Sequence, residues 1–219
     1  MTSSTLSLLY GSTNSGHSYK VRLFLLLTGT PHRYVWIDLN TPRPERPAAF
    51  RAASRFGEVP VWVDAAGASL CQSNAILMHL AQQNGQLAGA PGQWPRVTEW
   101  LGWEANRIGF SLPNLRVSRH FAAQPPEVDA WLERRTRADL QVLDATLAAS
   151  AADGPWLLPG ARPTIADLSC AAYLPWLHQA GLALEDWPAI GRWLAALAAE
   201  PGWQHPDTAL AATLPGTPS

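Results

Sequence analysis

The sequence predicts two parts, a small α/β domain followed by a domain built of helices alone. Three observations predict this fold. Over about the first third of the chain, short apolar and β-branched segments alternate with helical ones. The stretch NGQLAGAPGQWP, residues 84–95, is then rich in proline and glycine, as linkers are. Beyond it, apolar residues recur at helical spacing. We therefore expect a first domain over residues 1–83, a linker over 84–94 and an all-helical domain over 95–219.

The first domain is expected to hold seven elements in the order β-α-β-α-β-β-α, which describes a small sheet covered by helices. Aromatic and β-branched composition favours a strand at RYVWI, and Gly29 is expected to end the first helix. The expected strands are residues 6–10, 33–37, 59–63 and 69–71, and the expected helices are 18–27, 44–53 and 73–83.

Three features predict helices in the second domain. Thr164 and Asp167 have the spacing of a capping box, in which each side chain satisfies a free N–H of the other residue. Trp187-Pro188 is expected to begin a later helix with one apolar face. The members of that face are Ile190, Trp193, Leu194 and Leu197. An earlier apolar stripe consists of Val128, Leu132, Thr136, Leu140, Leu143 and Leu147.

Composition excludes several classes of function. The formal net charge of −1 over 219 residues favours neither a nucleic-acid nor a membrane surface as partner. The start, MTSSTLSLLYGS, lacks the basic and apolar segments of a secretory signal, so we expect a cytoplasmic protein. The two cysteines, Cys71 and Cys170, form no CxxC, and the six histidines show no metal-ligand spacing. We expect no metal.

The stretch STNSGHSYKVRL, residues 12–23, joins the first expected strand to the first helix with an unusual number of hydroxyl groups. A helix N-terminus carries unpaired N–H groups and about half a positive charge, so it favours a bound anion. Hydroxyl groups in the turn would add donors. The alternative is that Ser15 and Ser18 only cap the helix.

Two further segments are candidates for binding. In GEVPV, residues 57–61, a cis Val59–Pro60 bond would leave the N–H and C=O of Val59 free to pair with an extended peptide. The alternative is an ordinary trans proline at a sheet edge. In QSNAIL, residues 72–77, a hydroxyl again stands at a helix start, which suits a carboxylate. There too, capping alone is the alternative.

The three segments together, in this order and spacing, resemble the glutathione S-transferase family. The resemblance runs through LYGSTNSGHSYKVRLFLLLTGTPHRYVWIDL, GEVPVW and QSNAILMHLA, and the stretch RPTIADLSCAAYL is similar to that family's buried capping-box helix. It implies a thioredoxin-like N-terminal domain followed by an all-α C-terminal domain. It also implies glutathione as co-substrate, a homodimer and no metal.

The resemblance assigns roles to residues of the first domain. The backbone of Val59, before Pro60, would pair with the cysteinyl unit of glutathione. Gln72 and Ser73 would hold the γ-glutamyl carboxylate. The thiol would face the start of the first helix.

The SGxxYK motif is of the bacterial type, and Ser15 matches its serine. His17 stands where the family usually has asparagine, and with Ser15 it is a candidate to bind glutathione and activate its sulfur, since histidine can donate a hydrogen bond as asparagine does. Ser54, Arg55 and Phe56 precede Gly57 where the family commonly has Asn-Pro. The turn holds no cysteine, which disfavours chemistry through a protein thiol.

The co-substrate is expected to contact the first helix of the second domain, over residues 93–110. Its candidate contacts are Trp103, Asn106, Arg107 and Phe110. The alternative for Trp103 is a role in the core, since the chain has 11 tryptophans and most must serve packing.

The resulting hypothesis is an enzyme that conjugates the glutathione thiolate to a hydrophobic electrophile, a detoxification reaction. Two alternatives remain open. One is a glutathione-dependent disulfide-bond oxidoreductase. The other is a non-catalytic protein that binds glutathione or another ligand, because fold alone does not guarantee activity.

Overall fold

The structure, a computed structural model, describes residues 6–211 and divides them into two compact units. Of the described residues, 6–83 and 201–211 form the first unit, and Asn84–Glu200 form the second. No helix within residues 6–211 has both the length and the apolar character needed to cross a membrane.

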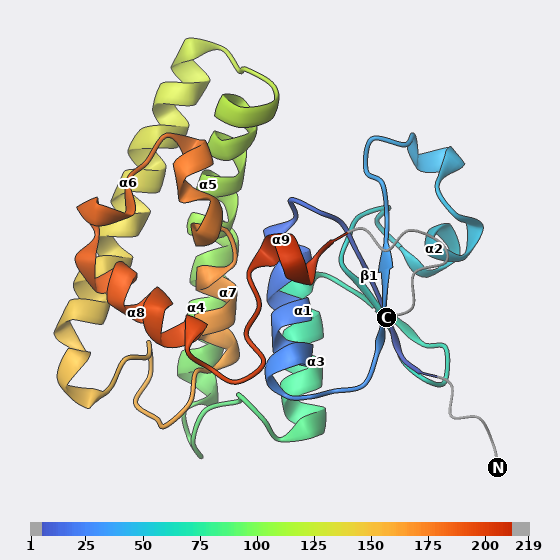
Figure 1. Ribbon diagram of the computed structural model, residues 1–219, viewed down its shortest axis with the longest axis horizontal. Coiled ribbons are helices and arrows are strands. Elements are labelled where there is room, and N and C mark those ends of the chain that lie inside the picture. The colour runs from blue at the N-terminus through green and yellow to red at the C-terminus, as the bar shows by residue number, and fades with distance from the viewer. Residues whose placement is uncertain (1–5, 212–219) are drawn as a thin grey trace. The chain divides into compact units, whose positions relative to one another are not determined.

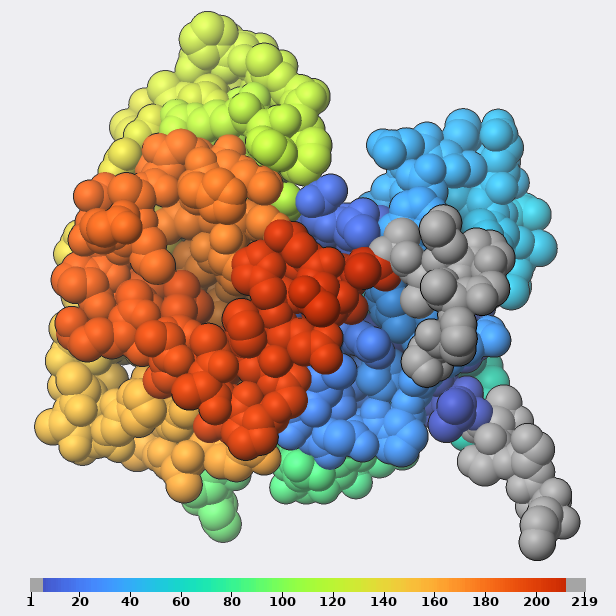
Figure 2. All heavy atoms as spheres, in the orientation of Figure 1, coloured from blue at the N-terminus to red at the C-terminus, as the bar shows by residue number. Residues whose placement is uncertain are grey.

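Residues 201–211 belong to the first unit, whereas the sequence division grouped them with the helices. They include the short helix α9, Pro206–Ala209. The Tyr19 hydroxyl donates to the backbone oxygen of Gln204 at 2.8 Å, and Gly202 packs against the backbone of Leu26. In the space-filling view these last described residues lie against the first helix (Figure 2).

A four-stranded mixed sheet forms the centre of the first unit. Its strands are β1 (Leu8–Gly11), β2 (Arg33–Trp36), β3 (Val61–Val63) and β4 (Ser69–Cys71), in the spatial order β2-β1-β3-β4. β1 and β2 are parallel, and the other pairs are antiparallel. β3 begins at Val61 rather than at residue 59, because Pro60 has no N–H for the ladder.

The helices of the first unit are α1 (Gly16–Leu27), η1 (Arg43–Glu45), α2 (Ala48–Ala53) and α3 (Ser73–Asn84). The single helix expected over residues 44–53 is wrong, since it is divided into η1 and α2. Pro47 lacks an N–H and pushes the preceding residue into extended backbone, and Arg46 accordingly has ψ 157°.

The strand register defines the two faces of the sheet. Tyr10 lies opposite Val35 and Val61, and this face packs on Phe50 of α2. By alternation, Leu9 with its partners Tyr34 and Trp62 faces the other way, where Figure 1 shows α1 and α3.

The second unit is helical throughout, and the two units together confirm the predicted fold class. Its elements are α4 (Trp94–Asn106), α5 (Ile108–Arg116), η2 (Val117–Phe121), α6 (Pro126–Ala149), η3 (Ala151–Asp153), α7 (Ile165–Ala171), η4 (Leu174–Ala180), η5 (Leu184–Asp186) and α8 (Pro188–Ala198). The apolar stripe of α6 is buried except for Val128 in the first turn. On the predicted face of α8, Leu194 is only half-buried.

One continuous helix over residues 93–110 is also wrong, because the chain breaks at Arg107. Arg107 has φ −118° and ψ −107°, far from helical values. Beyond the break, Gly109 packs directly on the buried carboxylate of Glu104, where a Cβ would not fit. Ser169 of α7 donates to the same carboxylate at 2.9 Å. The buried carboxylate of Glu104, which accepts a hydrogen bond from α7, therefore lies where the chain changes direction between α4 and α5.

The capping box at α7 is confirmed, and its aspartate does more than cap. Asp167 is fully buried and accepts hydrogen bonds from the N–H and the hydroxyl of Thr164, at 2.8 and 3.0 Å. It also accepts from the backbone of Leu157 at 2.9 Å and from the Trp193 indole at 3.0 Å. Burial raises the pKa of the Asp167 carboxyl, and the hydrogen bonds to its ionised form oppose that rise. Asp167 thus joins α7, α8 and the segment before them.

Asp167→Ala should reduce the free energy of unfolding by about 3 kcal/mol or more, because several buried donors lose their acceptor at once. Chemical denaturation would measure the change. Asp153→Ala, at an exposed carboxylate in η3, is the matched control and should be nearly neutral. Equal stability of the two variants would show that the network contributes little.

Candidate functional site

The hydroxyl groups before and within α1 form a hydrogen-bonded chain. The N–H of Ser12 donates to the Ser18 hydroxyl at 3.4 Å, and that hydroxyl donates to Oγ of Ser15 at 3.0 Å. The N–H of Ser18 also donates to Ser15 Oγ, at 3.1 Å. Ser15 is therefore an acceptor twice over. Within residues 6–211 its own proton has no acceptor, so it remains available to donate outward.

Ser15 serves as N-cap and still keeps a donor for a ligand. Capping uses the oxygen, whereas binding an anion would use the proton, so the two interpretations are compatible. The Gly16 N–H also has no acceptor in the described chain, and α1 presents the positive end of a 12-residue helix here. His17 is the second residue of α1 and is half-buried in the same turn. The arrangement favours an anion beside Ser15.

Tyr10 has no part in this turn. Its side chain is buried on the α2 face of the sheet, where the ring packs edge-to-face on Phe50 at a centroid distance of 5.6 Å. The candidate hydroxyl donors are therefore those of the α1 turn.

The Val59–Pro60 peptide bond is cis, as expected from the sequence. Val59 is half-buried and lies just before β3. Its backbone N–H and C=O make no hydrogen bond within residues 6–211. One donor and one acceptor on adjacent backbone groups are what an extended peptide needs for pairing.

The start of α3 differs from a simple cap. Gln72 is exposed and has a φ of 71°, in the left-handed region that is uncommon outside glycine, and its carbonyl accepts from Ile76 N–H at 3.0 Å. Such backbone conformations cluster at ligand sites. Ser73 is the first residue of α3 and only 9% exposed. Within the described residues its hydroxyl makes no hydrogen bond, so Ser73 does not cap the helix with its side chain.

Sequence analysis missed a contact that joins α1 to α3. The Lys20 ammonium donates to Oδ1 of Asn74 at 2.7 Å. Asn74 follows Ser73, and Lys20 lies one turn beyond the residues at the start of α1. The available clue was the single lysine of the sequence, placed in a helical segment rich in apolar residues.

The four residues expected to contact the co-substrate lie around the break between α4 and α5. Trp103 is half-buried and stacks edge-to-face on Trp100 at 5.3 Å between ring centroids. Phe110 is 44% exposed and packs instead toward α6, with Trp131 at 6.2 Å and the Arg135 guanidinium over its ring. Asn106 is the last residue of α4 and Arg107 is the break itself, and both are exposed. All four residues lie in one segment, but the ring of Trp103 contacts Trp100 and the ring of Phe110 contacts Trp131.

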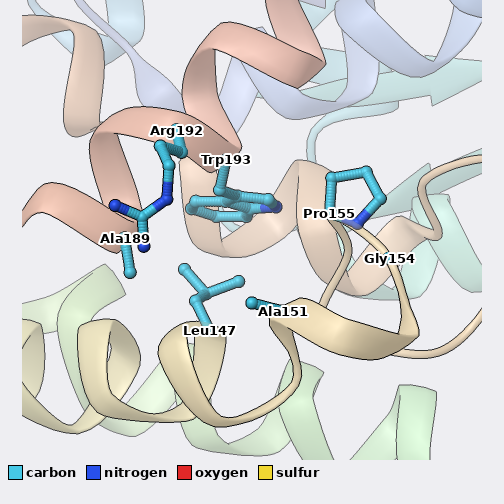
Figure 3. A pocket seen from close by; sticks show the side chains of 7 residues that line it. All are labelled: Leu147, Ala151, Gly154, Pro155, Ala189, Arg192 and Trp193. Carbon is cyan, nitrogen blue, oxygen red and sulfur yellow. The ribbon is translucent and has the colours of Figure 1, made fainter.

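The second unit has a separate cavity of about 290 Å³ between α6, α8 and the loop that follows η3. Figure 3 shows its side chains, with Arg192 beside Trp193 and Leu147 pointing toward them. The lining residues are Leu147, Ala151, Gly154, Pro155, Ala189, Arg192 and Trp193. None of the predicted site residues lines it. Among residues 6–211 no group of three or more His, Cys, Asp or Glu side chains could hold a metal ion.

Comparison with known proteins places this geometry in a family. Residues 14–83, which include the α1 turn from Asn14 onward and both later segments, match the model of the glutathione S-transferase N-terminal domain. The crystal structure of a glutathione S-transferase from Xanthobacter autotrophicus Py2 is 32% identical with a TM-score of 0.79, covering 90% of this chain and 95% of that one. One from Pseudomonas fluorescens Pf-5 is 27% identical with a TM-score of 0.80, covering 92% and 98%.

A curated relative carries a more specific name. Maleylacetoacetate isomerase of Pseudomonas aeruginosa is 27% identical over 220 residues, which cover 96% of this chain and 99% of the relative.

Proposed function

The chain belongs to the glutathione S-transferase family, and on that premise we propose that it binds glutathione on its first unit and adds the glutathione thiolate to a hydrophobic electrophile. The observation that carries the proposal is the hydrogen-bonded chain that ends at the Ser15 hydroxyl. The thiolate would accept a hydrogen bond from the Ser15 hydroxyl at the N-terminus of α1, where the helix carries its partial positive charge. The physiological role would be detoxification of electrophiles.

The energy required for thiolate formation is within the reach of this turn. A free thiol has a pKa of about 8.5, and lowering it by about 2 units requires roughly 2.7 kcal/mol of preference for the anion. A helix N-terminus supplies about 0.5–2 kcal/mol. One charge-assisted hydrogen bond supplies about 1.5–3 kcal/mol. The Ser15 hydroxyl and the N-terminus of α1 can together supply this free energy, without a metal or a protein thiol.

The remainder of glutathione would lie along the other two segments. The cysteinyl backbone would pair with Val59, whose backbone groups have no partner in the described chain. The γ-glutamyl carboxylate would accept from the Ser73 hydroxyl and from the start of α3, beside Gln72. His17 would add a further donor near the sulfur. Each role uses a polar group that the described chain leaves available or places in the same turn.

The co-substrate would contact the second unit at Trp103, Asn106, Arg107 and Phe110. We further propose a homodimer. It rests on family membership, and large apolar side chains are exposed on both units. They include Phe56, Phe110, Trp131 and Val142.

A second candidate is glutathione-dependent isomerisation of an electron-poor double bond. It is favoured by the likeness to maleylacetoacetate isomerase along nearly the whole chain. In such a reaction the sulfur adds to one carbon of the double bond. Rotation then occurs about the resulting single bond, and elimination restores both the double bond and the thiolate. Conjugation and isomerisation would thus share the Ser15 thiolate and differ in whether the sulfur leaves again.

Three assays on the purified chain separate the candidate functions. With chlorodinitrobenzene, the proposed activity yields a glutathione conjugate with release of chloride. With maleylacetoacetate, isomerisation yields the trans product without loss of glutathione. With hydroxyethyl disulfide, an oxidoreductase would yield oxidised glutathione. Binding of glutathione with none of these products would indicate a ligand-binding protein. Failure to bind glutathione in calorimetry would contradict the proposal altogether.

Ser73→Ala tests the carboxylate end of the site. We expect the Kd for glutathione to rise roughly tenfold, because one charge-assisted hydrogen bond is lost. The free energy of unfolding should change by no more than about 0.5 kcal/mol, because the Ser73 hydroxyl makes no cap bond. Calorimetry and chemical denaturation measure the two quantities. Ser69→Ala, at an exposed hydroxyl in β4, is the matched control. Lower stability with normal affinity would contradict the assignment.

A further inference from the structure

Lys20 is exceptional in this chain both by composition and by location. The sequence has 16 lysine and arginine residues, and Lys20 is the only lysine among them. Its side chain is only 1% exposed, although lysine is among the residues least often buried. Burying an ammonium group is costly unless other groups solvate it. A position that carries both the only lysine and this cost calls for a specific role.

The contact of Lys20 with Asn74 joins the second turn of α1 to the first turn of α3, and the two helices are far apart in sequence. The Nζ–Oδ1 distance is 2.7 Å, and the residues are separated by 54 positions. On one side, Lys20 follows Ser15 and the α1 N-terminus by about one turn. On the other side, Asn74 is the second residue of α3, immediately after Ser73. Figure 1 shows α1 and α3 beside each other on one face of the sheet.

We propose that Lys20 is a positioning residue, whose bond to Asn74 sets the spacing between the thiol end and the carboxylate end of the glutathione site. This inference rests on the proposed function. Apolar packing between α1 and α3 is non-directional and tolerates small sliding movements. A short, charge-assisted hydrogen bond has a defined length and direction. It therefore holds Ser73 at a fixed distance from Ser15, so that one tripeptide reaches both ends.

The choice of lysine fits this role. An ammonium is a compact donor on a long stem and can reach a single amide oxygen inside a packed interface. A guanidinium is planar and larger, and its five donors in a fixed fork would need more acceptors, differently placed, than the three donors of an ammonium. We therefore expect Lys20→Arg to lose glutathione affinity as Lys20→Met does, even though the other 15 basic residues of the chain are arginines.

The test compares a ligand that uses both ends of the site with ligands that use one. The two-ended ligand is glutathione. Cysteinylglycine keeps the thiol but lacks the γ-glutamyl carboxylate, and γ-glutamylalanylglycine keeps the carboxylate but lacks the thiol. Calorimetry gives the Kd of each for the wild type, Lys20→Met, Lys20→Arg and Asn74→Leu. Gln82→Leu, at an exposed amide on α3, is the matched control.

We expect Lys20→Met and Asn74→Leu each to raise the Kd for glutathione roughly tenfold, as expected for loss of one charge-assisted bond. Their affinities for the two single-ended ligands should remain close to those of the wild type. The double variant Lys20→Met/Asn74→Leu should bind glutathione no more weakly than either single variant, because both substitutions remove the same hydrogen bond. A general loss of structure would instead weaken all three ligands together.

A direct readout comes from the lysine itself. Labelling with ¹⁵N-lysine gives one side-chain Nζ resonance, and we expect slow solvent exchange that becomes fast in Asn74→Leu. This measurement remains informative should Lys20→Met fail to fold.

Three results would overturn the inference. They are unchanged glutathione affinity in folded Asn74→Leu, equal losses for all three ligands, or a rapidly exchanging Nζ in the wild type. A wild type that binds no glutathione would overturn the proposed function, and this inference with it.

Discussion

The central constraint on the first unit is that one turn of backbone must both start a helix and present a donor to solvent. The chain from Ser12 through Ser18 to Ser15 meets both requirements, because the Ser18 hydroxyl accepts from Ser12 and donates to Ser15, whose oxygen caps the helix and whose proton has no acceptor within residues 6–211. The surrounding structure is adapted to this turn. Asn14 adopts a left-handed φ of 66°, and Gly11 has no space for a Cβ between Tyr34 and Ser18. Sheet, turn and helix are therefore fitted together around Ser15.

Features encoded by neighbouring residues could be predicted from the sequence. The Ser15 cap, the Thr164–Asp167 box and the cis Val59–Pro60 bond each depend on a few adjacent residues, and all three are present. Features that depend on distant residues could not. Lys20 meets Asn74 across 54 positions, and Tyr19 meets Gln204 across 185. The break at Arg107 accompanies a carboxylate that is held by Ser169, 65 positions away.

The predicted binding residues fall into two groups with different support. Those of the first unit lie at helix starts and at an unpaired backbone, where the geometry itself favours an anion or a peptide. Those of the second unit lie beside a helix break, and their aromatic rings are already packed against other aromatic rings. The roles proposed for the first group do not depend on which reaction follows, because a bound thiolate would serve both conjugation and isomerisation. Which reaction follows depends on the electrophile, and a fold does not specify its substrate.

The most direct test of the account is the pKa of the thiol of bound glutathione, followed by its ultraviolet thiolate absorbance as a function of pH. We expect the thiol pKa to be lowered in the wild type relative to free glutathione, and to be higher in Ser15→Ala than in the wild type. Ser15→Thr keeps the hydroxyl, so its pH profile should be close to that of the wild type. His17→Asn should keep the lowered pKa and lose any transition near pH 6.5, about where a free imidazole titrates. Superimposable profiles for the wild type and Ser15→Ala would contradict the claim that the Ser15 hydroxyl stabilises the thiolate.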